Sequence, residues 1–182
     1  MNRRHAVLGL ALAATLALAP AAQAAGPDTV YLDTKDGRVT IELRPDLAPK
    51  HVKQIKTLVN QGFYNGLKFH RVIDGFMAQT GDPKGNGTGG SKLPDIPAEF
   101  SQAPFLRGTV GMARSGNPNS ANSQFFICLG PANFLDGQYT VVGVVTDGMN
   151  VIDKVKKGSK SDNGAVQDPD KIVKMQMAEK AN

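Results

Sequence analysis

Residues 69–82 read FHRVIDGFMAQTGD. Two short runs of strand-forming residues, 68–72 and 76–80, lie on either side of an Asp-Gly pair, which predicts two β-strands joined by a turn. Arg71 and Gln79 stand among aromatic and other apolar residues in this stretch. The stretch therefore combines a permanent cation and an amide with apolar side chains, and local structure alone does not explain that combination.

A second stretch of the same character follows in two pieces. Residues 111–115 read GMARS and residues 122–127 read NSQFFI. Two interpretations are open on the residues alone. The aromatic side chains fill a core between two hairpins while Arg71 lies on the surface, or the two stretches form the walls of one binding site.

The rest of the chain predicts a mainly β protein with few helices. Residues 30–43 alternate between apolar and polar side chains around a turn at 35–38, which predicts a hairpin. Residues 49–61 place their apolar side chains on one helical face and end before Gly62, which predicts a helix. We expect further strands at 109–113, 124–129, 139–145 and 172–177, and a second helix at 149–156. Many short strands indicate a sandwich or a barrel, and the pattern does not decide between them.

Two tempting motifs lack the context that their chemistry requires. Residues 85–90 read GNGTGG and match the glycine spacing of a dinucleotide site, but Pro94 and Pro97 follow where that site needs a helix. We expect a surface loop there. His51 and His70 are the only histidines after residue 24, without the paired spacing of a metal site, and we expect His51 to be exposed.

The first residues have the pattern of a secretory signal peptide. Arg3 and Arg4 precede an apolar run of 14 residues at 6–19, shorter than the ~20 residues that cross a bilayer. Residues 22–24, Ala-Gln-Ala, resemble a cleavage site. We predict a cleaved signal at 1–24, a single mature domain at 25–182, and a location in the bacterial periplasm, with no membrane attachment after cleavage.

The charge does not indicate a nucleic-acid-binding protein, and the single cysteine excludes an internal disulfide framework. The chain has 21 basic and 16 acidic residues; removal of Arg3 and Arg4 leaves 19 basic residues and a net charge of +3. That mild excess, without dense clustering, does not indicate a nucleic-acid partner. Cys128 is the only cysteine, so no internal disulfide is possible, and its apolar neighbours predict a buried thiol.

Three segments together resemble the cyclophilin family of peptidyl-prolyl cis–trans isomerases. They are FHRVIDGFMAQTGD at 69–82, ANSQFFI at 121–127 and NFLDGQYTVVG at 133–143. They stand in the family's order with family-like separations, and the resemblance extends from about residue 30 to residue 177. It implies a closed, eight-stranded antiparallel β-barrel capped by two α-helices. It also implies an isomerase that needs no metal or cofactor and acts on proline-containing unfolded or partly folded polypeptides.

 We expect the chain to act as a monomer.

The resemblance assigns catalytic or substrate-binding roles to twelve residues of this chain, which are the ten named next together with Phe134 and Tyr139. Arg71 matches the catalytic arginine, and Gln79 and Gln124 match the amides beside it. Phe76, Met77, Phe126 and Leu135 match the walls of the proline pocket. Ala113, Arg114 and Ser115 match the stretch that binds the substrate backbone, and the family often has Asn at the position of Arg114.

Two further departures concern ligands of the family. Phe134 stands where many eukaryotic members have a Trp that contacts cyclosporin, and Tyr139 stands where they have a His near the pocket. We therefore expect weak or no cyclosporin binding, with the isomerase centre intact. The alternative function is a proline-peptide binding module or holdase chaperone in which turnover is incidental. The sequence identifies neither the natural clients nor any preference for the residue before proline.

Overall fold

The computed structural model describes residues 26–178, and the predicted strands and first helix are present in it with slightly different bounds. In chain order the elements are β1 (Thr29–Thr34), β2 (Gly37–Leu43), α1 (Pro49–Asn60), β3 (Arg71–Ile73), β4 (Met77–Thr80), β5 (Thr109–Met112), β6 (Phe125–Cys128), a 3-10 turn η1 (Asn133–Leu135), β7 (Val141–Asp147), α2 (Met149–Ile152), a 3-10 turn η2 (Lys160–Asp162) and β8 (Lys174–Met177). The signal peptide predicted at 1–24 lies outside the described residues. Within residues 26–178, no helix is both long and apolar enough to cross a membrane.

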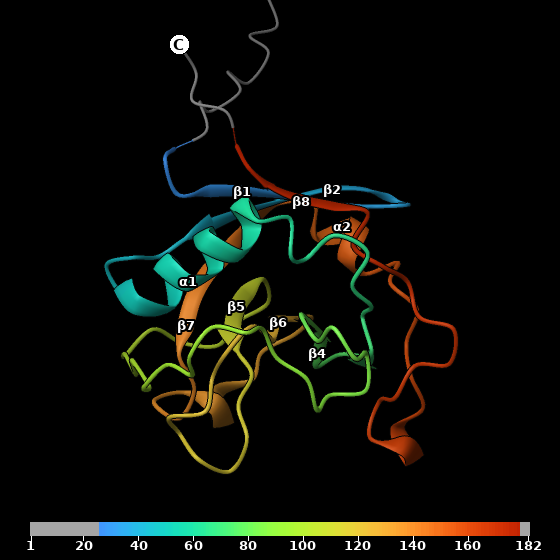
Figure 1. Cartoon of the computed structure of the whole chain (residues 1–182). Coiled ribbons are helices and arrows are strands. Elements are labelled where there is room, and N and C mark those ends of the chain that lie inside the picture. The colour runs from blue at the N-terminus through green and yellow to red at the C-terminus, as the bar shows by residue number, and fades with distance from the viewer. Residues whose placement is uncertain (1–25, 179–182) are drawn as a thin grey trace, which may run out of the picture.

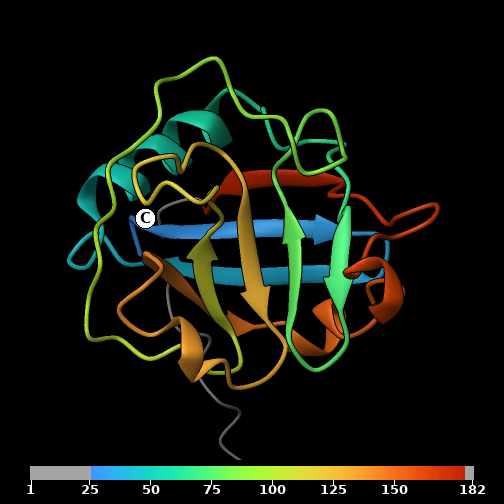
Figure 2. The same ribbon diagram turned by 90° about the horizontal axis from the view of Figure 1, so that it is seen from below.

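The eight strands form one antiparallel sheet in the order β3-β4-β6-β5-β7-β2-β1-β8. Figure 2 shows that β3, β4, β6 and β5 run across β1, β2 and β8, so the sheet curls over itself. The outermost strands β3 and β8 do not pair with each other. The prediction of a closed barrel is therefore wrong in that respect, because the sheet is an open, barrel-like one.

The sheet is open at β3, which is only three residues long. The outer edge of β3 bonds to a loop instead of a strand: the Val72 N–H donates to the Gly164 carbonyl at 2.8 Å, and the Gly158 N–H donates to the Val72 carbonyl at 2.9 Å. These two glycines allow the loop to fold tightly, since a Cβ at Gly158 would lie 2.0 Å from the Gly164 oxygen. The loop thus takes up the outer backbone groups of β3, and the segments just before β3 and β8 are paired only by an isolated bridge between Lys68 and Lys171.

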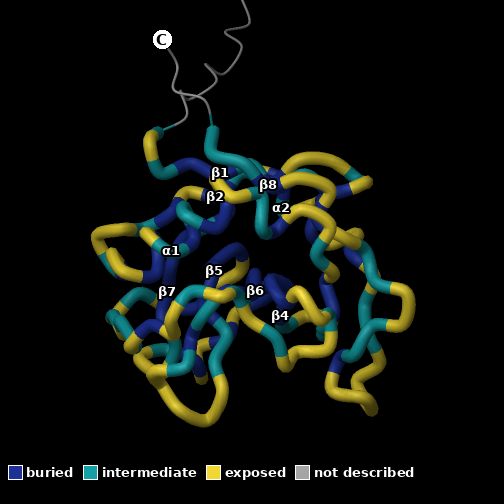
Figure 3. Tube along the Cα trace, in the orientation of Figure 1, coloured by how far each residue is buried: buried dark blue, intermediate teal, exposed yellow. Residues whose placement is uncertain are grey.

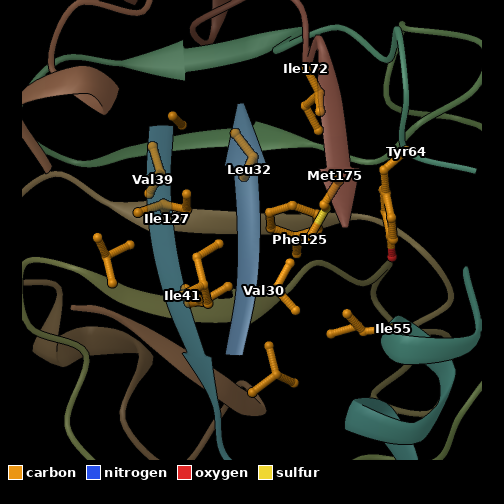
Figure 4. Packing of buried hydrophobic residues seen from close by; sticks show 14 of the residues in the cluster. Val30, Leu32, Val39, Ile41, Ile55, Tyr64, Phe125, Ile127, Ile172 and Met175 are labelled. Atoms are coloured by element: carbon orange, nitrogen blue, oxygen red, sulfur yellow. The ribbon is translucent and has the colours of Figure 1, made fainter. Parts of the chain in front are cut away.

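The main core lies between the inner face of the sheet and α1. Val30, Leu32 and Ile41 alternate with outward-facing residues along the first hairpin and are at most 1% exposed, as the period of two predicts. Figure 4 shows these side chains packed with Ile55 of α1 and with Phe125 of β6. Figure 3 shows the same pattern along the trace, with buried strands inside and exposed loops outside.

The first helix is held at its N-terminus by a distant residue. The N-cap is Ala48, whose side chain cannot accept a hydrogen bond, so the Glu99 carboxylate takes that place and accepts the N–H groups of Lys50 and His51 at 3.1 and 3.0 Å. His51 Nδ1 lies 2.6 Å from the same carboxylate, and its side chain is fully buried. The expectation that His51 is exposed is therefore wrong, because His51 lies on the buried face of the helix, where Glu99 offers its Nδ1 a partner.

The second helix is shorter than predicted. Regular α-helix ends at Ile152, because the next turn tightens to bonds three residues apart, from Lys154 N–H to Val151 and from Val155 N–H to Ile152. Val155 is nevertheless buried, as its place in the apolar pattern implies. Both helices pack beside the layer formed by β1, β2 and β8, α1 against β8 and α2 against β2 (Figure 1).

A second apolar cluster lies on the other face of β4, β6 and β7, because its residues alternate along these strands with residues of the main core. It is built from Met77, Phe105, Phe126, Cys128, Ala132, Leu135 and Val141. Cys128 is fully buried, as predicted, and burial raises the pKa of its thiol to about 12. The thiol therefore stays protonated at neutral pH and acts as a small apolar group. This cluster forms the floor of the site described next.

Candidate functional site

The register of the sheet places three predicted site residues in one row. Arg71 of β3 faces Gln79 of β4, and Gln79 faces Phe126 of β6. Residues opposite each other in antiparallel strands share a face of the sheet. Gly111 of β5 completes the row beside Phe126, and a Cβ there would lie 2.5 Å from the Phe126 ring. The missing side chain of Gly111 therefore leaves room for that ring.

This row borders a cavity of about 290 Å³ lined by ten residues: Arg71, Phe76, Met77, Gln79, Ala113, Arg114, Phe126, Phe134, Leu135 and Tyr139. All ten belong to the predicted set of twelve. The other two, Ser115 and Gln124, line an adjoining cavity of about 470 Å³ that shares Gln79, Ala113 and Arg114 with the first. The fold thus brings all twelve residues to one groove, although their roles remain predictions.

The floor of the smaller cavity is apolar and rigidly packed. Phe126 is 5% exposed, stacks on Phe105 with ring centres 5.8 Å apart, and meets the Tyr139 ring edge-on at 6.0 Å. Phe134 differs, because it is 64% exposed and lies 5.3 Å from the Phe76 ring at the rim. A rigid apolar cavity of this kind suits a small apolar ring of a ligand.

Arg71 supplies the positive charge at the edge of this cavity. Its Nη1 donates to Gln79 Oε1 at 3.2 Å and also lies 3.9 Å from the Met77 sulfur. Among the described residues, no carboxylate forms an ion pair with it. Burial lowers the pKa of Arg71, but a guanidinium stays charged at neutral pH. The charge is therefore oriented without being neutralised.

Asn163 is a residue of the site that sequence reasoning missed. Its carbonyl accepts from Arg71 Nε at 2.9 Å and its Oδ1 accepts from Nη2 at 3.0 Å. Asn163 has a φ of 46°, in the left-handed region that Asn tolerates better than most residues. The Asn-Gly pair at 163–164 does indicate a turn, but nothing in the sequence indicates that the turn lies against a residue 92 positions earlier.

A relay of amides connects Arg71 to the glycine-rich loop. Because Gln79 Oε1 accepts from Arg71, its Nε2 points away and donates to Gln124 Oε1 at 2.9 Å. Gln124 Nε2 in turn donates to the carbonyls of Gly87 and Gly89 at 3.0 and 2.8 Å. The two glutamines therefore have separate geometric roles, which the sequence left open: Gln79 contacts Arg71, and Gln124 contacts the loop.

The glycine-rich loop is a surface loop, as predicted, and no helix follows it before β5. The buried Asp82 carboxylate organises it by accepting the N–H groups of Lys84, Asn86 and Gly87 at 2.8, 3.0 and 2.6 Å. Gly89 is required there, since a Cβ would lie 2.1 Å from Asp82 Oδ1. The loop therefore serves as a wall of the larger cavity.

Arg114 lies where the two cavities meet. Its guanidinium stacks over the Tyr139 ring at 4.4 Å and donates to the carbonyls of Gln138 and Ser115 at 3.0 and 2.9 Å. In the described part of the chain, no three His, Cys, Asp or Glu side chains are grouped as metal ligands.

Comparisons with known proteins agree on one family. The family described as cyclophilin type peptidyl-prolyl cis-trans isomerase/CLD matches residues 29–177. A Brucella suis protein named probable peptidyl-prolyl cis-trans isomerase is 63% identical over 181 residues, covering 91% of this chain and 92% of that protein.

Solved structures show the same likeness. The cyclophilin AquaCyp293 from Hirschia baltica has a TM-score of 0.74 at 30% identity, covering 85% of this chain and 76% of that one. A Cryptosporidium parvum cyclophilin type peptidyl-prolyl cis-trans isomerase, solved in the presence of the dipeptide Ala-Pro, has a TM-score of 0.75 at 30% identity, covering 83% and 99%.

Proposed function

The chain belongs to the cyclophilin-type peptidyl-prolyl cis–trans isomerases, and from this premise we propose that Arg71 catalyses rotation about Xaa-Pro bonds by stabilising the twisted prolyl nitrogen. The observation that carries the proposal is the position of Arg71: charged, unpaired with any described carboxylate, and fixed at the edge of an apolar cavity. The dipeptide in the Cryptosporidium structure contains proline, which supports a proline-containing substrate here.

The chemistry requires no bond to break. The peptide bond resists rotation, with a barrier of about 18–20 kcal/mol, because the nitrogen lone pair is delocalised into the carbonyl. On twisting, the lone pair returns to the prolyl nitrogen, which becomes a hydrogen-bond acceptor. A donor that meets this nitrogen binds the transition state more tightly than the ground state, which is the condition for catalysis.

The groove divides this work among its residues. Phe126, Met77 and Leu135 hold the proline ring, and the low dielectric of their surroundings strengthens the contact with Arg71. A hydrogen bond to a charged group contributes about 1.5–3 kcal/mol, whereas a millionfold acceleration requires about 8 kcal/mol. The remainder must come from binding the substrate in a partly twisted form, with its backbone along residues 113–115.

The test compares the protein from residue 25 onward with its Arg71→Ala and Arg71→Lys variants. Cis–trans exchange of a short Xaa-Pro peptide is followed by NMR exchange spectroscopy, with enzyme far below peptide concentration. We expect acceleration by the wild type, a loss of at least about tenfold in Arg71→Ala, and only partial rescue by Lys, which lacks the guanidinium fork. An Arg71→Ala variant within about threefold of wild type would refute this mechanism.

The same assay distinguishes the enzyme from a holdase. A catalyst acts well below one equivalent, whereas the effect of a binding module saturates at one equivalent of peptide. A folded wild type that binds proline peptides without accelerating exchange would assign the groove to binding alone.

We further propose that the clients are exported proteins folding in the periplasm. The support is the signal pattern at 1–24. Cell fractionation checks it: the full chain is expected in the periplasm in a shortened form, and a chain without residues 2–24 in the cytoplasm. Equal distribution of both would contradict the proposal. Weak cyclosporin binding is proposed from Phe134 and Tyr139, and calorimetric titration that finds tight binding would exclude it.

A further inference from the structure

The arginines of this chain fall into two groups. The structure describes five, and three of them form two-pronged ion pairs with an aspartate: Arg38 with Asp33, Arg44 with Asp46, and Arg107 with Asp153. The other two, Arg71 and Arg114, form no ion pair among residues 26–178, and both line the same cavity. The two unpaired guanidinium groups therefore lie together at the groove.

Arg114 is held in place with donors to spare. It donates to main-chain carbonyls and stacks on Tyr139, and these contacts fix the plane of the guanidinium without neutralising its charge. These bonds use three of the five N–H groups of the guanidinium, which leaves two for a ligand. A charged group presented in this way is suited to a carboxylate, which accepts two parallel bonds from an arginine.

Arg114 also borders every part of the groove. It lines the apolar cavity, the larger cavity beside the glycine-rich loop, and a third cavity of about 740 Å³ that extends past His70. Two carboxylates line these cavities as well, Asp95 and Asp162, and neither forms an ion pair with any of the five described arginines. Because Arg114 lines the apolar cavity itself, a peptide with its proline in that cavity passes Arg114 within about two residues. An extended chain advances only ~3.3 Å per residue.

We propose that Arg114 is a specificity residue that favours substrates with an aspartate or glutamate within two residues of the proline. The inference rests on the proposed function, since it names the class of peptide that the groove prefers. Arg71 is engaged with the prolyl nitrogen in that mechanism, and Arg114 is the second charge, available to an acidic side chain. The partial exposure of Arg114 limits the gain to roughly two- to fivefold in kcat/KM, the range of an exposed ion pair.

The test uses end-blocked peptides that differ at one position. Glu, Gln or Lys is placed either just before or just after the proline, and kcat/KM is measured by NMR exchange. We expect the wild type to prefer Glu over Gln in at least one series and to disfavour Lys. Raising the ionic strength from about 0.02 M to about 0.5 M is expected to reduce the preference.

Variants of Arg114 identify the source of the preference. Arg114→Gln is expected to bring the Glu:Gln ratio close to one, Arg114→Glu to reverse it in favour of Lys, and Arg114→Lys to retain part of it. Arg44→Gln is the matched control, because it removes the same charge at an exposed ion pair outside these cavities. The control is expected to keep the wild-type ratio.

The outcomes separate this inference from the proposed function. If the wild type accelerates Glu and Gln peptides equally in both series, or if Arg114→Gln keeps the preference, the specificity role is refuted while catalysis stands. If no peptide is accelerated, the proposed function itself fails. The salt dependence of the wild type needs no variant, so a misfolded variant does not prevent a decision.

Discussion

Replacing Asn163 by Gly tests whether the loop at 158–166 positions the catalytic arginine. The change removes the Oδ1 acceptor, 3.0 Å from Arg71 Nη2, and keeps the main-chain acceptor, 2.9 Å from Nε. Glycine adopts the φ of 46° at this position without strain, so the loop itself is expected to keep its conformation.

The expected magnitude follows from that single contact. A hydrogen bond to a charged group contributes about 1.5–3 kcal/mol, and the exposure of this one reduces the value to about 1 kcal/mol. If the contact orients Arg71 for the transition state, kcat falls about fivefold while KM changes little. The midpoint of thermal unfolding is expected to stay within about 2 °C of wild type.

Asn163→Asp provides the comparison. Aspartate keeps the acceptor and tolerates the same backbone conformation, but it places a carboxylate beside Arg71 and partly neutralises it. We expect a larger loss of kcat than in Asn163→Gly, and a partial recovery at high salt. Both variants are assayed by NMR exchange with a neutral peptide. If both retain kcat within twofold of wild type, Asn163 is only a turn residue and the reasoning is wrong.

Two further predictions concern packing and the cap of the first helix. Gly111→Ala places a Cβ 2.5 Å from the Phe126 ring. This overpacking is expected to lower the free energy of unfolding by about 1–3 kcal/mol, and with it the unfolding midpoint and kcat/KM. An unchanged midpoint in calorimetry would argue against the tight fit. Glu99→Gln is expected to lower the free energy of unfolding by about 1 kcal/mol at pH 7, because it weakens the cap of the first helix. Burial raises the pKa of Glu99, but the hydrogen bonds from His51 and the helix N–H groups outweigh it and hold the pKa below its usual value. The higher stability of the wild type over Glu99→Gln is therefore fully present above the unfolded pKa of about 4.3 and vanishes as the pH falls through the lower folded value. A stability difference between the two proteins that persists at pH 2.5 in urea unfolding would contradict this account.

Much of the fold was predictable because it rests on local patterns. The alternation at residues 30–43 specifies a hairpin, and the apolar face at 49–61 specifies a helix, since each pattern acts within a few residues. The motif at 69–82 likewise indicated which residues share a groove. Strand pairing then placed Arg71 opposite Gln79, and both beside the apolar cavity.

The two wrong predictions, a closed barrel and an exposed His51, share a different cause. The sheet stays open at β3, where the Val72 backbone bonds to a loop that lies 86 to 92 residues later, at Gly158 and Gly164. His51 is buried on the inner face of the first helix, where its Nδ1 meets Glu99, 48 residues away. Neither contact has a local signature, so periodicity and composition do not reveal it.

The sequence by itself determined the elements, the family and the chemical types of the groove residues, because these follow from short-range periodicity and from motifs that can be read along the chain. Only the tertiary structure decided that Asn163 holds Arg71, that Gln79 and Gln124 form a relay, and that Arg114 lies at the junction of the cavities without an ion pair to any carboxylate of residues 26–178. The physical reason is that a hydrogen bond or an ion pair depends on the distance between two atoms in space. For residues far apart in the chain, that distance is set by the packing of the whole sheet and its loops.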